Sequence, residues 1–200
     1  MLTLYIVRHG ETEENAAGIL QGHLQGHLSE LGKEQARQLR QYLTTLTPPQ
    51  DIWVSDLQRT IDTANILNQS FHLPLHPCEL LRERDWGELT GHSIAHLPKE
   101  FPSSVESIPH LLERARNFLE VLQQTYHHED RYLLVVTHGL YSRALQAVIL
   151  NKEMHEIPRM QNGEIRILQI STNDETKNMA NPVSHLSLQQ DEIEPLDSES

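Results

Sequence analysis

The sequence contains almost no cysteine and no long apolar run. Cys78 is its single cysteine, which excludes an intramolecular disulfide and suits a reducing compartment. No stretch approaches the roughly 20 apolar residues of a membrane-spanning helix. The apolar run 2–7 is short, has no basic leader and is followed directly by Arg8, so it predicts a strand rather than a secretory signal. We therefore expect a cytoplasmic protein without a membrane partner.

Basic residues are also scarce. Lysine and arginine number 16 against 28 acidic residues, which gives a net charge of −12 and argues against a nucleic-acid partner. The last 30 residues hold seven acidic residues and one lysine, and so carry half of this net charge. They contain no aromatic residue and no regular apolar period. The pattern predicts one domain over residues 1–170 and a flexible acidic tail over residues 171–200, with a partner-binding peptide as the alternative.

Within residues 1–170, short apolar segments alternate with segments of helical periodicity. Continuous apolar runs predict buried strands at 2–7, 52–54 and 133–136, with another near Leu75. Apolar stripes predict helices at 31–46 (with Ser29 as N-cap), 57–67, 108–122 and 140–150. Alternation at 164–170 predicts an antiparallel edge strand, whose exposed edge would permit a homo-oligomer. We expect an α/β three-layer sandwich: a mostly parallel central sheet with one antiparallel edge strand and helices on both faces.

Basic and imidazole side chains follow three of these predicted strands. Arg8 and His9 follow the first strand, Arg59 lies in the first turn of the helix after the second, and His138 follows the third. The carboxyl ends of parallel strands share one edge of a sheet, where ligands bind. Two arginines, two histidines and two helix N-termini are therefore expected to converge there. In a protein of net charge −12, such a positive pocket indicates an anionic ligand.

Phosphate is the ligand that matches these groups. The planar arginine fork fits phosphate oxygens, and helix N-termini add backbone N–H donors. A neutral histidine nitrogen is also a nucleophile toward phosphorus. Gly10 and Gly139 directly follow the two histidines, which predicts a close approach of backbone and ligand at those positions.

Five motifs extend this pattern in a fixed order over residues 2 to about 150. They are Arg8-His9-Gly10-Glu11-Thr12 with Asn15, Gln21-Gly22 followed by Leu28-Ser29-x-x-Gly32, Ser55-x-Leu57-x-Arg59, Glu83-Arg84-Asp85-Trp86-Gly87-x-x-x-Gly91, and Thr137-His138-Gly139. Together they resemble the signature of the histidine phosphatase superfamily, the phosphoglycerate mutase-like proteins. The resemblance covers about three quarters of the chain.

The resemblance implies a catalytic role for three residues and a phosphate-binding role for several more. His9 would attack phosphorus and become phosphohistidine, and Glu83 would protonate the leaving oxygen and then activate water. His138 would act with the phosphate-binding group, which comprises Arg8, Asn15, Gln21, Arg59, His138 and Gly139. An adjacent anionic phosphate favours the protonated form of Glu83 that the first step needs. The resemblance implies no metal and no cofactor.

Two features favour a phosphatase of the family over a mutase. Gln21-Gly22 is more similar to the phosphatases. The segment 91–106 is short, and Lys99 is its one strongly basic residue, whereas the mutases carry a long insertion there that covers the site. Water exclusion, which a mutase requires, would be poor under a short lid. We expect phosphomonoester hydrolysis of a small phosphorylated metabolite; a mutase and a catalytically silent phospho-ligand-binding scaffold stay open as alternatives.

Other polar and aromatic residues are secondary candidates, and the sequence does not decide whether they contact substrate. Glu106 lies in an element similar to the family's Gly-Glu-Ser, with Val105 in place of the glycine. His23 borders the expected phosphate loop. Trp86 and Tyr141 would favour a flat leaving group if they line the pocket.

Overall fold

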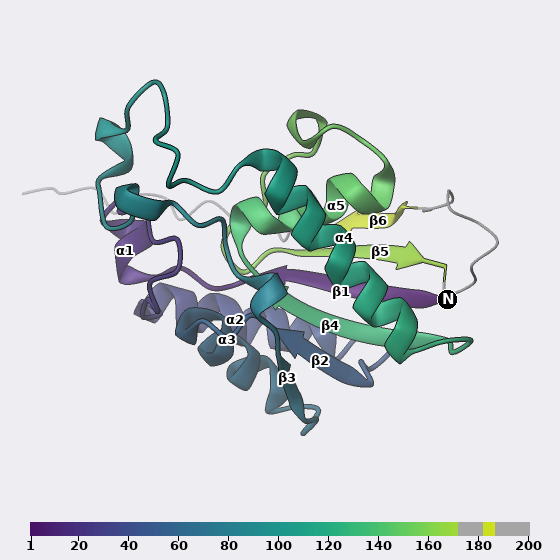
Figure 1. Cartoon of the computed structure of the whole chain (residues 1–200). Helices are drawn as coiled ribbons and strands as arrows, with labels where there is room; N and C mark the ends of the chain where they lie inside the picture. Colours follow the sequence, from purple (N-terminus) through teal and green to yellow (C-terminus); the bar gives the residue numbers. More distant parts are fainter. Residues whose placement is uncertain (172–181, 187–200) are drawn as a thin grey trace, which may run out of the picture.

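The computed structural model describes residues 1–171 and 182–186. Its strands form one sheet in the order β3-β2-β4-β1-β5-β6 (Figure 1). The strands are β1 (Leu2–Arg8), β2 (Asp51–Val54), β3 (Leu75–Pro77), β4 (Arg131–Thr137), β5 (Ile165–Ile170) and β6 (Pro182–Leu186). Strands β1 to β4 pair in parallel, whereas β5 runs antiparallel to both β1 and β6.

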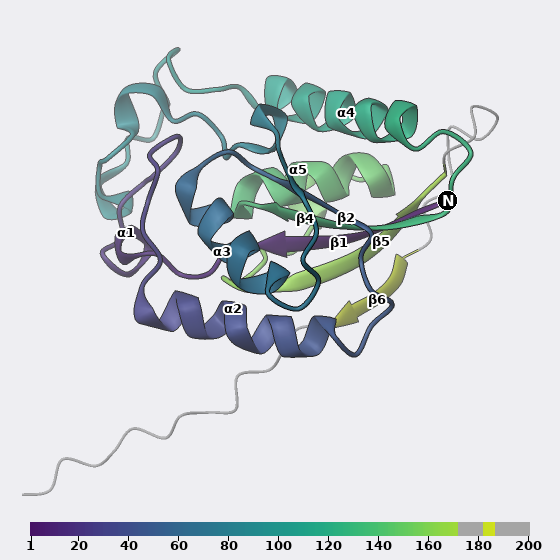
Figure 2. The same ribbon diagram turned by 90° about the horizontal axis from the view of Figure 1, so that it is seen from below.

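Helices cover both faces of this sheet, as Figure 2 shows. Helices α2 (Glu30–Leu43) and α3 (Gln58–Asn68) pack on one face, and α4 (Ile108–Thr125) and α5 (Gly139–Leu150) on the other. The shorter helices are α1 (Glu13–Ala16) and the 3₁₀ turns η1 (Glu79–Leu81), η2 (Gly87–Leu89), η3 (Ile94–His96) and η4 (Met154–Glu156). The expected three-layer α/β sandwich is confirmed. None of the helices within the described residues is long and apolar enough to span a membrane.

Strand β1 lies in the middle of the core and is apolar on both faces. Leu4 and Ile6 pack toward α4 and α5, while Tyr5 and Val7 pack toward α2 and α3. All four are 3% exposed or less. Burial on both sides explains why the strand has a continuous apolar run rather than an alternating one. It also fixes the position of the two residues at its end, Arg8 and His9.

The helix starts differ in how their free N–H groups are satisfied. Ser29 caps α2 as predicted, because its Oγ accepts the Gly32 N–H at 3.0 Å. Helix α4 is capped in the same way by Ser107. The N-cap residue of α5 is His138, whose side chain makes no capping hydrogen bond. The first N–H groups of α5 are therefore available to another residue.

The structure modifies the predictions for the C-terminal part of the sheet. Strand β5 is antiparallel as predicted, but β6 pairs along its other side, so β5 is second from the edge. The homo-oligomer prediction relied on an exposed edge at β5, and β6 occupies that edge. Strand β6 also lies within the predicted tail. Residues 172–181 and 187–200 lie outside the described residues, and the division of the chain at residue 170 stays a prediction.

Gly10 has a different role from the one predicted. A Cβ at this position would lie 2.3 Å from the carbonyl oxygen of Gly32. The glycine is thus required because the loop after β1 packs against the start of α2, and an approach of ligand at this position stays a prediction. At Gly139 an added Cβ would lie 3.1 Å from Cζ of Arg8, so this glycine makes room for the arginine side chain.

Candidate active site

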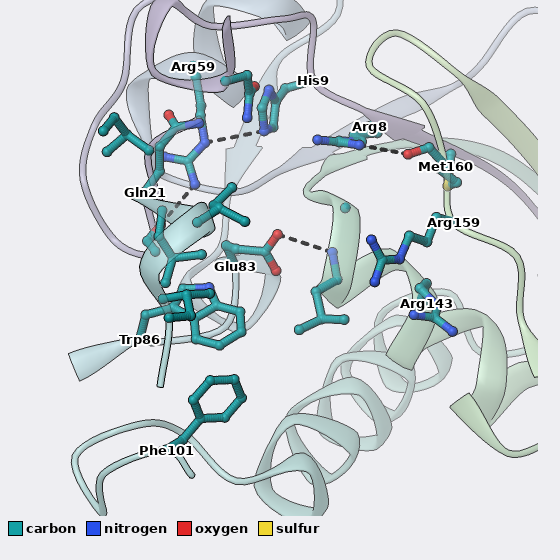
Figure 3. Close-up of a pocket in the computed structure, with 18 residues that line it drawn as sticks. Arg8, His9, Gln21, Arg59, Glu83, Trp86, Phe101, Arg143, Arg159 and Met160 are labelled. Atoms are coloured by element: carbon teal, nitrogen blue, oxygen red, sulfur yellow. Dashed lines mark hydrogen bonds between the residues drawn. The ribbon is translucent and has the colours of Figure 1, made fainter. Parts of the chain in front are cut away.

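A cavity of about 410 Å³ lies at the carboxyl edge of the parallel strands (Figure 3). Loops from the ends of β1, β2 and β4 meet here, because Ser55 and His9 each donate a backbone hydrogen bond to the last residues of β4. The cavity is lined by Arg8, His9, Asn15, Ile19, Leu20, Gln21, Gly22, Arg59, Glu83, Trp86, Ile94, Leu97, Phe101, Gly139, Leu140, Arg143, Arg159 and Met160. The predicted convergence of Arg8, His9 and Arg59 at one edge is therefore present.

His9 is held with one particular nitrogen toward Arg59. Its Nδ1 lies 2.7 Å from the Gly10 carbonyl oxygen, to which it can only donate. Its Nε2 accepts a 3.3 Å hydrogen bond from Nε of Arg59. Burial, followed by the charges of Arg59 and Arg8, holds the pKa of His9 well below its usual value. At neutral pH the imidazole is thus uncharged, with its unprotonated lone pair on Nε2 directed at Arg59.

Arg59 links this histidine to the loop 20–26. Its Nη2 donates to the Gly22 carbonyl oxygen at 2.8 Å, and its Nη1 donates to the Leu24 carbonyl oxygen. Arg59 is 1% exposed, and burial lowers its pKa to about 10, so its guanidinium stays charged at neutral pH. The buried Oε1 of Gln21 has no hydrogen-bond partner within the described part of the chain. Arg59 therefore places a permanent cation beside Nε2 of His9 and fixes the loop that carries Gln21.

Arg8 provides the second cation. Its Nη1 donates to the Met160 carbonyl oxygen at 2.7 Å, and its buried Nε has no hydrogen-bond partner among residues 1–171 and 182–186. Burial lowers the pKa of this guanidinium, while the carboxylate of Glu83 acts in the opposite direction. Arg8 thus adds a second guanidinium to the lining of the cavity.

His138 lies beside His9 rather than on the cavity wall. Their rings meet edge to face with centroids 5.2 Å apart, and Nε2 of His138 lies 2.8 Å from Oγ of Ser55. The ring is fully buried, and burial holds its pKa well below the usual value. Asn15 does line the cavity, and its Oδ1 accepts the Thr12 N–H at 3.2 Å. Contact of His138 with phosphoryl oxygens stays a prediction.

Glu83 occupies the uncapped N-terminus of α5. Its Oε1 accepts N–H groups from Tyr141 and Arg84, each at 2.9 Å, and its Oε2 accepts the Leu140 N–H at 3.1 Å. The carboxylate faces the cavity across from His9 and Arg59 (Figure 3). A helix N-terminus favours a negative group, which explains why an acidic side chain is held at this point of a cationic pocket.

A buried ion pair behind the cavity holds the loop that carries Glu83. Arg114 on α4 donates to the carbonyl oxygens of Leu80, Arg82 and Glu83 and pairs with Glu106 at 2.7 Å. Glu106 is not a cavity residue; its Oε2 accepts the Asp85 N–H at 3.1 Å. The pair therefore acts on the backbone on both sides of Glu83. This contact assigns to Glu106 a positioning role that the sequence left open.

We expect the substitution Glu106→Gln to misplace Glu83 without removing it. Loss of the carboxylate weakens the Arg114 contact, and displacements near 1 Å at a reacting group cost roughly 10-fold to 100-fold in rate. The loss in kcat/KM, which reports the first displacement, is expected with alkyl phosphates, whose leaving oxygen needs a proton, and is expected to be smaller with 4-nitrophenyl phosphate. Glu113→Gln, an exposed carboxylate on α4, is the matched control. An equal loss with both substrates would contradict the positioning role.

The structure adds residues that the sequence did not single out. Arg143 and Arg159 line the cavity, and so do Ile94, Leu97 and Phe101. Arg143 could have been noticed in the sequence, since it is the one charged residue of helix α5. Arg159 follows a proline in an irregular segment, and no sequence pattern marks it as a cavity residue. Both arginines thus come from outside the segment 91–106.

Among the secondary candidates, Trp86 lines the cavity and Tyr141 does not. His23 makes a 3.0 Å contact from Nε2 to the Glu83 carbonyl oxygen and is not a cavity residue either. Within the described residues no group of three or more histidine, cysteine or acidic side chains is arranged to hold a metal ion.

An α/β sheet that brings arginines, a neutral histidine and a carboxylate to its carboxyl edge is typical of enzymes that transfer phosphoryl groups. The family model of the histidine phosphatase superfamily (branch 1) matches residues 4–182. The chain therefore belongs to this superfamily.

Its relatives include several phosphatases. The uncharacterized phosphatase PhoE of Bacillus subtilis is 32% identical over 150 residues, covering 72% of this chain and 76% of the relative. A metal-independent phosphoserine phosphatase of Arabidopsis thaliana is 28% identical over 92% of this chain and 83% of its own. The mycobacterial glucosyl-3-phosphoglycerate phosphatase, solved in complex with VO3, superposes with a TM-score of 0.76 at 29% identity, covering 84% of this chain and 92% of the other.

Proposed function

We propose that this protein hydrolyses phosphomonoesters through a phosphohistidine at Nε2 of His9, with Glu83 as proton donor. The observation that carries the proposal is a neutral, buried histidine whose unprotonated nitrogen faces Arg59, with Arg8 beside it and a carboxylate across the same cavity. The superfamily and its phosphatase members support the same reaction.

The reaction divides into two displacements at phosphorus. In the first, the lone pair on Nε2 of His9 forms the N–P bond while the P–O bond to the leaving group breaks, and Glu83 gives its proton to the leaving oxygen. In the second, Glu83 takes a proton from water, the water oxygen attacks phosphorus, and the N–P bond breaks to release phosphate. Arg8 and Arg59 neutralise the charge on the phosphoryl oxygens in both steps.

The proposed substrate is a small phosphorylated metabolite, and the proposed site of action is the cytoplasm. The cavity volume of about 410 Å³ lies within the range of small-molecule sites. The relatives named for phosphoserine and for glucosyl-3-phosphoglycerate act on compounds of this size class. The single cysteine, Cys78, and the negative net charge support a reducing compartment and a partner other than nucleic acid.

The direct test is phosphate release from a panel of small phosphomonoesters, measured with and without a metal chelator. We expect release that the chelator does not diminish. A mutase would instead move the phosphoryl group within its substrate or to a second acceptor without net release. The 39% identity with a probable phosphoglycerate mutase over 48% of this chain makes this alternative worth testing. Binding of panel compounds with neither release nor transfer would contradict the proposal and favour a silent scaffold.

A further inference from the structure

Two arginines line the cavity on the side away from His9 and Arg59. Arg143 comes from α5, and Arg159 comes from the segment between η4 and β5. Figure 3 shows both guanidinium groups to the right of Glu83 and below Arg8, on the side of the cavity away from Arg59. Burial, followed by the charge of Arg159, lowers the pKa of Arg143, so the two guanidinium groups are close enough to interact.

No carboxylate of the described residues pairs with either arginine within 4.0 Å. The contacts of Arg143 are neutral: Nε donates to the Ile157 carbonyl oxygen at 2.8 Å and Nη2 to the Met154 carbonyl oxygen at 2.7 Å. These contacts fix the guanidinium and leave Nη1 available. The side chain of Arg159 is exposed and makes no hydrogen bond within the described part of the chain. In a protein of net charge −12, two adjacent cations without a counter-ion indicate that an external anion binds between them.

The transferred phosphoryl group does not account for these two cations. Arg8 and Arg59 already flank His9. The leaving oxygen must lie beside Glu83, which protonates it, so the leaving group extends past Glu83 toward Arg143 and Arg159. Along that path the opposite wall is apolar, formed by Trp86 and Phe101, whose rings meet edge to face at 5.5 Å.

We propose that Arg143 and Arg159 form a subsite for a second anionic group, so that the preferred substrates carry a carboxylate or a second phosphate on an organic leaving group. This proposal rests on the proposed hydrolase function. The apolar wall of Trp86 and Phe101 contacts the organic part between the two anions, and the arginines bind its charged end. Charge at the far end thus becomes the specificity-determining feature of the substrate.

The test compares aryl phosphates that differ in one para group. The probes are 4-carboxyphenyl phosphate, 4-(phosphonomethyl)phenyl phosphate and the neutral 4-carbamoylphenyl phosphate, which matches the carboxylate in shape. We expect kcat/KM for at least one charged probe to exceed that for the neutral probe by about tenfold or more, the effect of a hydrogen bond to a charged group. The charged probe with the larger ratio identifies the group, carboxylate or phosphate, that the subsite prefers.

Variants separate the subsite from general electrostatics. Arg159→Gln is expected to lower the ratio of charged to neutral kcat/KM about tenfold, mainly through KM. Arg116→Gln removes the same charge from the exposed face of α4 and is expected to leave that ratio unchanged. The subsite would be overturned if Arg159→Gln and Arg116→Gln had equal ratios of charged to neutral kcat/KM. It would also be overturned if Arg159→Gln lowered kcat/KM equally for charged and neutral probes. Arg143→Lys is a second variant, which keeps the charge but loses the fork that anchors it.

A binding measurement keeps the two proposals distinguishable. Calorimetric affinities of the three probes are compared in the His9→Ala protein, with and without Arg159→Gln, where no turnover is needed. If a charged probe binds more tightly and Arg159→Gln removes this difference, the subsite is supported even when the unaltered protein hydrolyses no probe. A lack of hydrolysis would contradict only the hydrolase proposal. Equal affinities for charged and neutral probes would refute the subsite whatever the activity.

Discussion

Phosphate release is expected to disappear when His9 is replaced by alanine. Among the residues that the structure describes, no other group of the cavity offers an unprotonated imidazole nitrogen beside Arg8 and Arg59. Removal of a catalytic nucleophile typically costs about 10⁴-fold or more in kcat. The measurement is phosphate release by His9→Ala against the unaltered protein, with the best substrate of the panel. His127→Ala, an exposed histidine at the end of α4, is the matched control and is expected to keep full activity.

Two further observations make the His9 result specific. Rapid denaturation of the unaltered protein during turnover of a ³²P-labelled substrate should trap label on the chain as an acid-labile phosphoramidate, and His9→Ala should trap none. Thermal unfolding of the variant is measured alongside, because its ring packs against His138 and bonds to the Gly10 carbonyl oxygen. A folded His9→Ala protein that retains activity within tenfold of the unaltered protein would eliminate the phosphohistidine mechanism.

The central part of the fold was predictable because its strands are buried on both faces. Strands β1 and β4 have continuous apolar runs that periodicity identifies directly, and parallel pairing then brings their ends to one edge. Strand β6 gives no such signal, since Pro182–Leu186 contains serine and histidine within an acidic segment. Its place in the sheet comes from pairing with β5, which is a long-range contact that local pattern does not encode.

The same distinction applies to the site. Arg8, His9 and Arg59 could be placed from the sequence because each follows a strand or starts a helix at the carboxyl edge. Arg159 could not, because its position depends on how the segment between η4 and β5 folds over the cavity. The glycines show a further limit: Gly10 and Gly139 both follow histidines, yet one accommodates the backbone of Gly32 and the other the side chain of Arg8. Sequence identifies the need for glycine there but not the neighbour that causes it.

Substitution of Glu83 by glutamine is expected to separate the two chemical steps. Glutamine keeps an oxygen that can accept the N–H groups of Tyr141 and Arg84 at the start of α5, but it cannot give or take the proton. Loss of a general acid typically costs about 10² to 10⁴ in rate. With alkyl phosphates the first step therefore slows by this factor and no burst of alcohol is seen. Glu120→Gln, an exposed carboxylate on α4, is the control.

With 4-nitrophenyl phosphate the outcome for Glu83→Gln differs, because nitrophenolate leaves without a proton. Formation of phosphohistidine at His9 then stays fast, whereas its hydrolysis, which needs Glu83 as base, is slow. We expect a burst of nitrophenolate equal to the enzyme concentration, followed by slow turnover and accumulation of phosphorylated enzyme. Equal loss for alkyl and nitrophenyl phosphates without a burst would mean that Glu83 serves to cap α5. The proton would then have to come from another group, and the path of the leaving group toward Arg143 and Arg159 would have to be redrawn.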